Sequence, residues 1–400
     1  MACGGPYFSK LLLNAILFSV SKFSDRPETY DDPADQSTAG IRFLRRCKDL
    51  LGSALDQSSI PTIQAMLLLS SSLFALGYQS APWLYSGIAI RMIFDLGLQH
   101  DGLSPSIKAE DLEVRRRVVW AAFVSDKIIS LYQGRAVSFR ESDMHVPNRF
   151  LDRYEELELW TPFAFGNNLR YPGAPARAVS TFTSLCSLSV IMGQIISHIY
   201  AERAKERPER YLETLAEGLE RWESQLPPEI RFNPSDPACS VPPPHVMSLQ
   251  RVNLEYVWGL SIYHILVILL HRPFVESGHL QLSDSALVES CWAKCEKAAT
   301  SATLALSRYR ETFTLARAPY LISYTTYVAA TIHVRNAAQR GSQSEAGNLL
   351  SICLEGLKEN SLTNTGVSKM YDIIRGLMRR LGVVLPHLLP EGNHLQGEGS

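Results

Sequence analysis

The sequence predicts an all-α fold of packed antiparallel helices without a substantial β-sheet. Long stretches rich in Leu, Ala, Ile, Glu and Arg alternate with clusters of turn residues. Period-two alternation bounded by turns, the pattern of half-buried strands, is nearly absent. Hydrophobic residues make up 46% of the 400 residues and charged residues 20%, which suits a chain with a sizeable core rather than a disordered one.

The apolar periodicity predicts a series of helices, most of them about 15 to 28 residues long, as is typical of a packed helical domain or a helical array. In chain order they cover residues 7–24, 38–55, 60–76, 82–97, 108–133, 178–203, 208–225, 246–270, 284–312, 317–340, 344–359 and 366–384. The longest loops between them are 98–107, 140–177 and 226–245.

We interpret residues 1–385 as one domain and residues 386–400 as a disordered tail. The prolines of 226–245 mark the best internal boundary, although such a loop can also be a surface excursion inside one domain. No internal repeat is strong enough to predict a solenoid.

One segment needs a test for a membrane span, because no residue between Asp56 and Arg91 is charged. Polar residues, glycine and proline interrupt this stretch, and its longest helix, about 60–76, is short for a hydrocarbon core of ~30 Å. We therefore expect two buried helices around a turn from Gly77 to Pro82, and no membrane association.

The charge balance disfavours a nucleic-acid-binding surface. The chain has 39 basic and 40 acidic side chains and a formal net charge of −1, whereas binding to DNA phosphates usually requires a basic excess. We therefore expect no direct nucleic-acid contact. The seven scattered cysteines are typical of reduced thiols in a cytosolic or nuclear protein.

Common catalytic signatures are missing from the sequence, which has no G-x-S-x-G, H-E-x-x-H or G-x-x-x-x-G-K motif. Cys291 and Cys295 lie four residues apart on one predicted helix face. Since no second pair stands at zinc spacing, we expect two buried thiols and no metal site. His264 and His271 lie two helical turns apart, so we expect core or capping side chains rather than joint ligands.

The sharpest sign of an enzyme is the D-D-x-x-D pattern of residues Asp31 to Asp35, which helical isoprenoid synthases use to hold Mg²⁺ and a diphosphate. Such carboxylates must project from one helix face, and Pro33 disfavours helical geometry at Asp32. We therefore expect a solvated loop before the next helix. A Mg²⁺-dependent α-helical synthase stays open as a minor alternative.

Several segments, read in order, resemble the fungal-specific transcription factor domain, also called the middle homology region. Trp83–Asp101 (WLYSGIAIRMIFDLGLQHD) is similar to the family's A-x-R-M-A-x-x-L-G-L-H element. Glu113–Gln133 (EVRRRVVWAAFVSDKIISLYQ) resembles E-x-R-R-R-x-W-W-x-x-F-x-x-D-R-x-x-S. Gly134-Arg135-Ala136 follows, with Ala where the family often has Pro, and then Ser142–Pro147 (SDMHVP).

The resemblance continues on both sides of this block and covers roughly residues 6 to 335. Pro6–Asp25 resembles the family's opening helix, and Trp222–Phe232 (WESQLPPEIRF) its W-x-x-x-L-P-x-x-L element. Tyr263–Phe274 (YHILVILLHRPF) is similar to Y-x-x-x-x-I-x-L-H-R-P-F.

We interpret the motif residues as structural or regulatory. Arg91 with Asp95, and the run Arg115, Arg116 and Arg117 with Asp126, are expected to form buried or half-buried ion pairs between packed helices. Three acidic residues between 110 and 113 precede the arginine run, as suits the positive end of a helix. The remaining members are the core residue Trp120, the turn residues Gly134 and Arg135, and the helix-ending unit His271, Arg272 and Pro273.

The chain departs from the family's pattern at its N-terminal part. In the family this region follows a binuclear zinc cluster of six cysteines, whereas only Cys3 precedes Cys47 here. The resemblance therefore implies no zinc or other cofactor in this chain. Whether the chain is a fragment or a natural truncation stays open.

The resemblance implies a non-enzymatic regulatory domain that controls transcription of metabolic genes by RNA polymerase II. It implies a nuclear location, or a nuclear and cytoplasmic one. The implied partners are a small-molecule effector or a co-regulator protein, and a second copy or a zinc-cluster relative in a dimer. The alternative is a stand-alone helical interaction protein that modulates full-length relatives.

Overall fold

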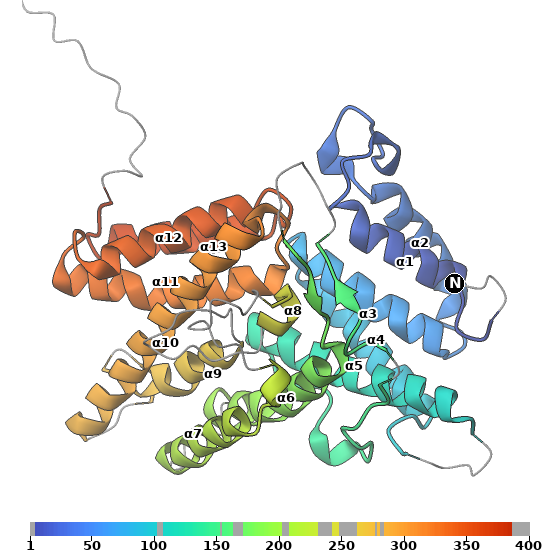
Figure 1. The fold of residues 1–400 in the computed structure, drawn as a ribbon, viewed down its shortest axis with the longest axis horizontal. Coiled ribbons are helices and arrows are strands. Elements are labelled where there is room, and N and C mark those ends of the chain that lie inside the picture. The colour runs from blue at the N-terminus through green and yellow to red at the C-terminus, as the bar shows by residue number, and fades with distance from the viewer. Residues whose placement is uncertain are drawn as a thin grey trace, which may run out of the picture.

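The chain forms an assembly of helices (Figure 1). The computed structural model describes residues 5–101, 107–152, 154–162, 171–201, 208–230, 242–247, 262–276, 278–280 and 284–385. These ranges contain thirteen α-helices and one pair of two-residue antiparallel strands. The predicted all-α fold is therefore confirmed.

The first seven helices are α1 (Lys10–Ser21), α2 (Ile41–Ala54), α3 (Ile60–Ala75), α4 (Ser80–Asp95), α5 (Ala109–Gln133), α6 (Ala178–Ile199) and α7 (Pro208–Ser224). The next six are α8 (Pro244–Met247), α9 (Ile262–His271), α10 (Ser285–Thr312), α11 (Tyr320–Arg340), α12 (Glu345–Asn360) and α13 (Val367–Arg380). The strands are β1 (Leu159–Trp160) and β2 (Ala174–Pro175). The 3₁₀ turns are η1 (Pro27–Thr29), η2 (Gln36–Thr38), η3 (Glu141–Asp143), η4 (Pro228–Ile230), η5 (Arg272–Phe274) and η6 (Leu315–Arg317).

Nearly all the predicted helices are present, with ends shifted by a few residues. The exception is the predicted helix 246–270, of which residues 248–261 lie outside the described part of the chain. Local signals explain several ends. Ser9 accepts a hydrogen bond from the Leu12 N–H at the start of α1. Gly134 ends α5 in the left-handed conformation, at φ 62°.

Neighbouring helices in the sequence mostly pack against one another. In the N-terminal part α1 contacts α2 and α3, and α3 contacts α4. In the C-terminal part α9 contacts α10, α10 contacts α11, and α11 contacts α12 and α13. Helices α5 and α6, which contact each other, lie between these two parts (Figure 1). Each part has its own cluster of buried apolar side chains.

The two parts also meet directly, where the turn after α3 touches the turn before α13. The Gly366 N–H donates to the Ala75 carbonyl at 3.0 Å. A Cβ on Gly366 would lie 2.7 Å from the Gly77 nitrogen, so this approach requires glycine. Nearby, Lys22 Nζ donates to Asn364 Oδ1 at 2.7 Å. Contacts between residues far apart in the sequence therefore join the N-terminal and C-terminal parts.

The uncharged stretch after Asp56 forms α3 and α4 around a turn at Gly77, as predicted. Among the described residues, α6 is the one helix long and apolar enough to cross a membrane, judged by length and composition. Half of its most apolar 18-residue window is buried in the fold. Residues 231–241, most of the predicted boundary loop, and the predicted tail 386–400 lie outside the described residues.

Candidate functional site

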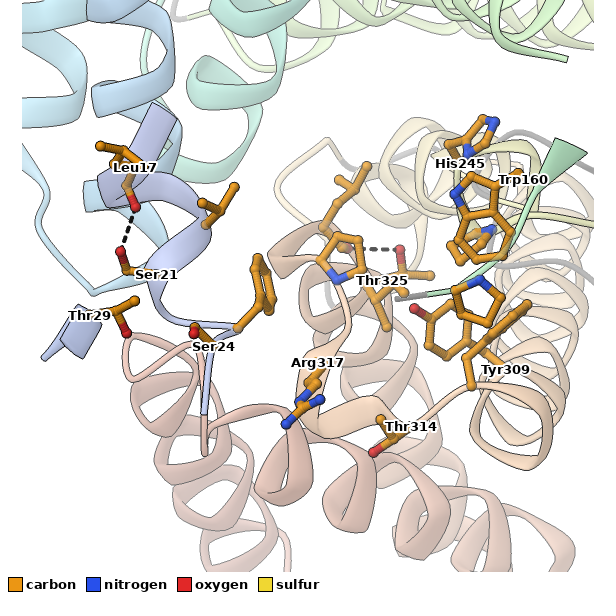
Figure 2. A pocket seen from close by; sticks show the side chains of 18 of the residues that line it. Leu17, Ser21, Ser24, Thr29, Trp160, His245, Tyr309, Thr314, Arg317 and Thr325 are labelled. Atoms are coloured by element: carbon orange, nitrogen blue, oxygen red, sulfur yellow. Dashed lines mark hydrogen bonds between the residues drawn. The ribbon is translucent and has the colours of Figure 1, made fainter. Parts of the chain in front are cut away.

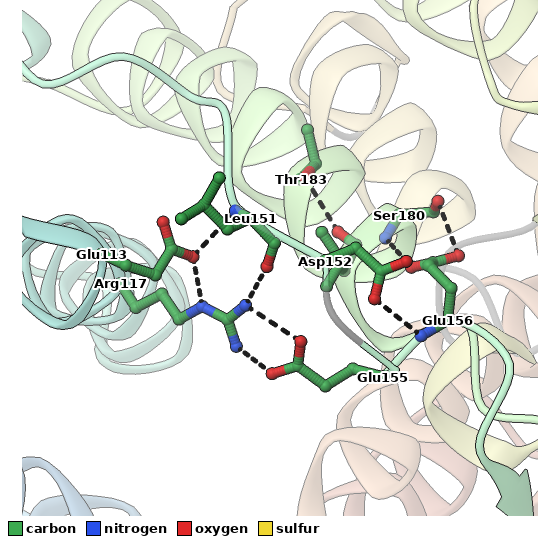
Figure 3. A network of polar contacts seen from close by, with 9 residues as sticks. Glu113, Arg117, Leu151, Asp152, Glu155, Glu156, Ser180 and Thr183 are labelled. Carbon is green, nitrogen blue, oxygen red and sulfur yellow. Dashed lines mark hydrogen bonds and ion pairs between the residues drawn. The ribbon is translucent and has the colours of Figure 1, made fainter. Parts of the chain in front are cut away.

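Arg117 fastens the loop that follows residue 150 to α5 (Figure 3). Its Nε contacts Glu113 Oε1 at 2.6 Å and its Nη1 contacts Glu155 Oε1 at 2.7 Å. Its Nη2 donates to the Leu151 carbonyl at 2.7 Å. Glu156, which follows Glu155 in the same loop, accepts hydrogen bonds from the N–H and hydroxyl of Ser180. The loop is thereby tied to both α5 and α6.

Arg116 forms a second half-buried ion pair, with Nε and Nη2 at 2.8 and 2.6 Å from the two carboxylate oxygens of Asp101. Arg116 and Arg117 therefore form half-buried ion pairs as expected, but their partners lie in loops or in α5 itself rather than on a packed neighbouring helix, and Asp126 is not among them. Arg115 is half-buried, and no ion pair joins it to another described residue.

The predicted ion pair between Arg91 and Asp95 is wrong. Both side chains are exposed, and no ion pair joins them. Helix α4 buries the face that carries Ala89, Ile90 and Ile93. Residues 91 and 95 lie one turn apart on the opposite, solvent-facing side, so no neighbouring helix buries these two side chains.

Asp126 instead forms a buried ion pair with the next residue, Lys127, at 2.9 Å. The Asp126 carboxylate also accepts from the backbone N–H groups of Ser138 and Phe139. Lys127 donates to the Phe139 carbonyl and lies 3.8 Å from the centre of the Phe123 ring. Burial lowers the Lys127 pKa, and the adjacent Asp126 opposes that shift.

This buried pair positions the segment after α5, which begins with the turn residue Gly134. Helix α6 leaves space for the lysine, because a Cβ at Gly193 would lie 2.9 Å from Lys127 Cε. Trp120 is buried, as expected, and its Nε1 donates to the Pro147 carbonyl at 3.2 Å. The motif residues of α5 therefore hold the loops on either side of Pro147 against the helix.

Two motif segments far apart in the sequence, Gly134-Arg135 and Arg272, line one hollow of about 1080 Å³, which we call the basic cleft. Its walls come from the C-terminal end of α5, the segment 134–142, α6, η5 and α11. Its lining includes three arginines, Arg135, Arg140 and Arg272, and the tyrosines Tyr132, Tyr200, Tyr324 and Tyr327.

Arg272 enters the cleft from the end of α9. The groups that raise its pKa are tyrosine hydroxyls, with Tyr200 also hydrogen-bonded to it, while burial opposes that shift and is the largest effect. Tyr200 in turn donates to the Leu269 carbonyl at 2.8 Å. No carboxylate of the described residues forms an ion pair with Arg272. It also lies close to Arg335, whose pKa is lowered by burial and by the Arg272 charge.

The other two members of the helix-ending unit, His271 and Pro273, are buried. His271 is buried, and its Nδ1 is 2.8 Å from the Val267 carbonyl one turn back. Burial lowers the His271 pKa to about 4, so the ring is neutral near pH 7. Pro273 is buried in η5, directly after the end of α9. The interpretation of His271 as a core or capping side chain is confirmed.

A second hollow of about 980 Å³, which we call the apolar cavity, lies between the end of α1 and the α10–α11 connection. Figure 2 shows Ser21 and Thr29 on one side and Trp160 and Tyr309 on the other. Phe313 packs edge-on against Trp160 at 5.8 Å between ring centres. None of the site residues predicted from the sequence lines this cavity.

The candidate chemical groups outside the clefts have local roles. Cys291 and Cys295 are buried, as expected, and burial raises both thiol pKa values, that of Cys295 to about 12. Asp31, Asp32 and Asp35 lie exposed in the predicted loop. Their carboxylates contact Arg45, the Ala34 N–H and the Ser37 N–H respectively. The part of the chain that the structure describes holds no cluster of three His, Cys, Asp or Glu suited to a metal ion.

Sequence reasoning did not single out the tyrosines of the basic cleft or Lys127. Tyr324 and Tyr327 lie three residues apart in α11 and therefore share a helix face. That spacing is a usable signal, but it looks the same in an ordinary packed helix. Only the approach of α11 to α5 and α6 reveals the cleft.

Comparison with known proteins gives consistent matches. A family model described as the fungal specific transcription factor domain matches residues 5–224. The nitrogen assimilation transcription factor nirA of Emericella nidulans is 28% identical over 350 residues, or 85% of this chain and 37% of the relative. The nitrogen assimilation transcription factor nit-4 of Neurospora crassa is 26% identical over 390 residues, or 95% and 33%.

A more distant relative is the activatory protein CHA4 of Saccharomyces cerevisiae, 26% identical over 249 residues, or 58% of this chain and 35% of the relative. The chain thus spans about a third of the length of these curated relatives. No solved structure matches the chain.

Proposed function

Because the chain belongs to the fungal-specific transcription factor domain family, we propose that it regulates transcription of metabolic genes by RNA polymerase II. The observation that carries the proposal is the family match over residues 5–224. The relatives are transcription regulators, two of them named for nitrogen assimilation. On this proposal the chain acts in the nucleus and controls a DNA-binding module rather than reading DNA itself, in line with its near-zero net charge.

The regulatory step we propose is a shift between two arrangements of the helices that surround the basic cleft. The cleft is lined by α5 and α6, and by α9, η5 and α11 from the C-terminal part of the chain. A ligand that contacts both groups of elements binds one arrangement better and therefore increases its population. A co-regulator protein, a second copy of the chain or a zinc-cluster relative then distinguishes the two arrangements.

We propose that the chain has no catalytic activity. The best enzyme-like signal, Asp31 to Asp35, fails on geometry, because its carboxylates do not project from one helix face. Each of them contacts a neighbouring group of the same loop or of α2. A purified chain that turns over a prenyl diphosphate with Mg²⁺, and loses this activity in Asp31→Asn, would contradict this.

The regulatory proposal is tested by fusing the chain to a heterologous DNA-binding module that drives a reporter gene. We expect the reporter output of the fusion to change when the nutrient source changes. The module alone is the control for effects of the module and the promoter. A folded fusion whose output equals that of the module alone under every nutrient condition would contradict the proposal.

A further inference from the structure

The described lining of the basic cleft carries an excess of positive charge. Four cationic side chains line it, Lys127, Arg135, Arg140 and Arg272, against one acidic side chain, Glu141. Lys127 is neutralised by Asp126 outside the lining. The charge balance of the lining is therefore three guanidinium groups against one exposed carboxylate. Because the low-dielectric walls of a cleft concentrate the electric field, this charge attracts an anion more strongly than the same charge on an open surface.

Two of these arginines are held in place without losing their charge. The Arg135 guanidinium lies over the Trp83 ring, 5.0 Å from its centre, and Arg272 lies against the Tyr200 hydroxyl. Neither has an ion-pair partner among the residues that the structure describes. A guanidinium has five N–H donors in a planar fork that matches a carboxylate or phosphate. The remaining donors are therefore available to an oxyanion.

The rest of the cleft suits an organic body rather than a bare inorganic ion. Tyr132, Tyr324 and Tyr327 form an aromatic wall, with ring centres of Tyr132 and Tyr324 4.0 Å apart. Leu131 and Leu269 add aliphatic surface. A hollow of about 1080 Å³ is slightly larger than the usual small-molecule site, so it has room for an organic molecule.

We propose that the basic cleft binds a small organic anion, whose carboxylate or phosphate group is bound by Arg272 and Arg135 and whose carbon skeleton packs against the tyrosine wall. The two arginines come from different elements that line the cleft, the loop after α5 and the turn after α9. An anion that both arginines bind links these two elements. Its role as the signal for transcription rests on the proposed function, whereas the binding itself does not.

The test is calorimetric titration of the purified full chain with two panels of metabolite-sized probes. One panel contains organic di- and tricarboxylates, and the other contains sugar phosphates and nucleoside monophosphates. The uncharged amide or nucleoside of each probe is the control. We expect at least one probe to bind, with an affinity that falls as salt rises, and its uncharged counterpart not to bind. The panel that binds identifies the source of the oxyanion.

Arg272→Gln and Arg135→Gln each remove one charge from the cleft while keeping a polar side chain. We expect each to weaken binding of the probe about 10- to 100-fold. Arg45→Gln, at an exposed ion pair on α2, is the matched control and should bind as wild type does. Circular dichroism identifies any variant that fails to fold, and the other cleft variant then decides.

Two outcomes overturn the proposal. One is a folded wild-type chain that binds no probe of either panel. The other is a probe whose affinity is the same in Arg272→Gln, Arg135→Gln and Arg45→Gln. Because no transcription is measured here, anion binding together with an inert reporter fusion would refute only the proposed function.

Discussion

The basic cleft and the apolar cavity have similar volumes, about 1080 and 980 Å³, but they differ in whether a carboxylate neutralises their half-buried arginines. In the apolar cavity, the half-buried Arg317 is neutralised by Asp25 at 2.6 Å, the second lining arginine, Arg26, is exposed to solvent, and aromatic rings form part of the remaining wall. In the basic cleft, Arg272 meets tyrosine hydroxyls and no carboxylate of the described residues. Size alone therefore does not distinguish the two hollows, whereas charge compensation does.

The two hollows also differ in how their walls are held. The loop that carries Arg135 is fixed by the buried pair of Asp126 and Lys127. The wall of the apolar cavity depends on packing between rings, with Tyr309 and Phe313 5.3 Å apart. A polar scaffold is directional, and removal of one partner leaves a buried charge unpaired. Packed rings lose contacts in proportion to the volume removed.

The largest effect is expected from Asp126→Ala, which breaks the scaffold of the basic cleft. The change leaves the Lys127 charge buried and removes the acceptor of the Ser138 and Phe139 N–H groups. We expect the free energy of unfolding to fall by about 3–5 kcal/mol, as measured by urea denaturation. Asp31→Ala, at the exposed pair with Arg45, is the control and should have little effect. Equal losses in both variants would contradict the scaffold role.

Phe313→Ala tests the apolar cavity in the same way. Phe313 is buried and contacts Trp160, Tyr171 and Tyr309. We expect a loss of about 3 kcal/mol in the free energy of unfolding, at the low end for such a change because the ring already borders a hollow.

The same variant sharpens the comparison, because the two hollows should act independently. The affinity of the basic cleft for its anion should be unchanged in Phe313→Ala, as measured by calorimetry. A folded variant with weakened anion binding would show instead that the apolar cavity and the basic cleft are coupled.

Gly193→Ala is expected to have a smaller effect, because it changes the space around Lys127 without removing a charge. The new Cβ would lie 2.9 Å from Lys127 Cε, and the hydrogen bonds of the Lys127 ammonium limit how far the side chain can move. We expect a loss of about 1–3 kcal/mol in the free energy of unfolding. Gly218→Ala in α7, where the Cβ meets no atom within 4 Å, should stabilise the chain by up to about 1 kcal/mol.

The smallest effect concerns the pH dependence of the free energy of unfolding that His271, the neighbour of Arg272, causes. The pKa of His271 falls from 6.5 to about 4 in the fold, so the unfolded chain binds the proton first as pH falls. Stability therefore decreases between pH 6.5 and 5, by about 1.5 kcal/mol for this residue. His271→Gln should flatten this part of the pH profile of urea denaturation, whereas His279→Gln at an exposed site should not. An unchanged profile in His271→Gln would show that other groups cause the pH dependence.

Helix positions were predictable because they depend on local properties. Apolar periodicity, glycine and proline at the turns, and capping residues such as Ser9 act within a few residues of sequence. The ends of α3 and α5 accordingly agree with prediction to within one residue. The segments that resemble the family were also readable, because each of them is contiguous.

Ion-pair partners were less predictable, because the candidates for each charge are many and the fold decides between them. Arg91 and Asp95 have helical spacing that favours pairing, but both side chains are exposed. Asp126 was expected to meet an arginine of the 115–117 run. It pairs instead with Lys127, because both side chains form hydrogen bonds with the backbone of Phe139.

The sequence by itself determined the all-α class, the order of the helices and the motif segments, because periodicity and turn chemistry are local. Only the tertiary structure brought Arg135 and Arg272 to one cleft, because that depends on how α5, α6, α9 and α11 pack. It also decided which arginines are neutralised. Charge compensation depends on distances of a few ångströms between residues far apart in the chain, and sequence spacing does not report such distances.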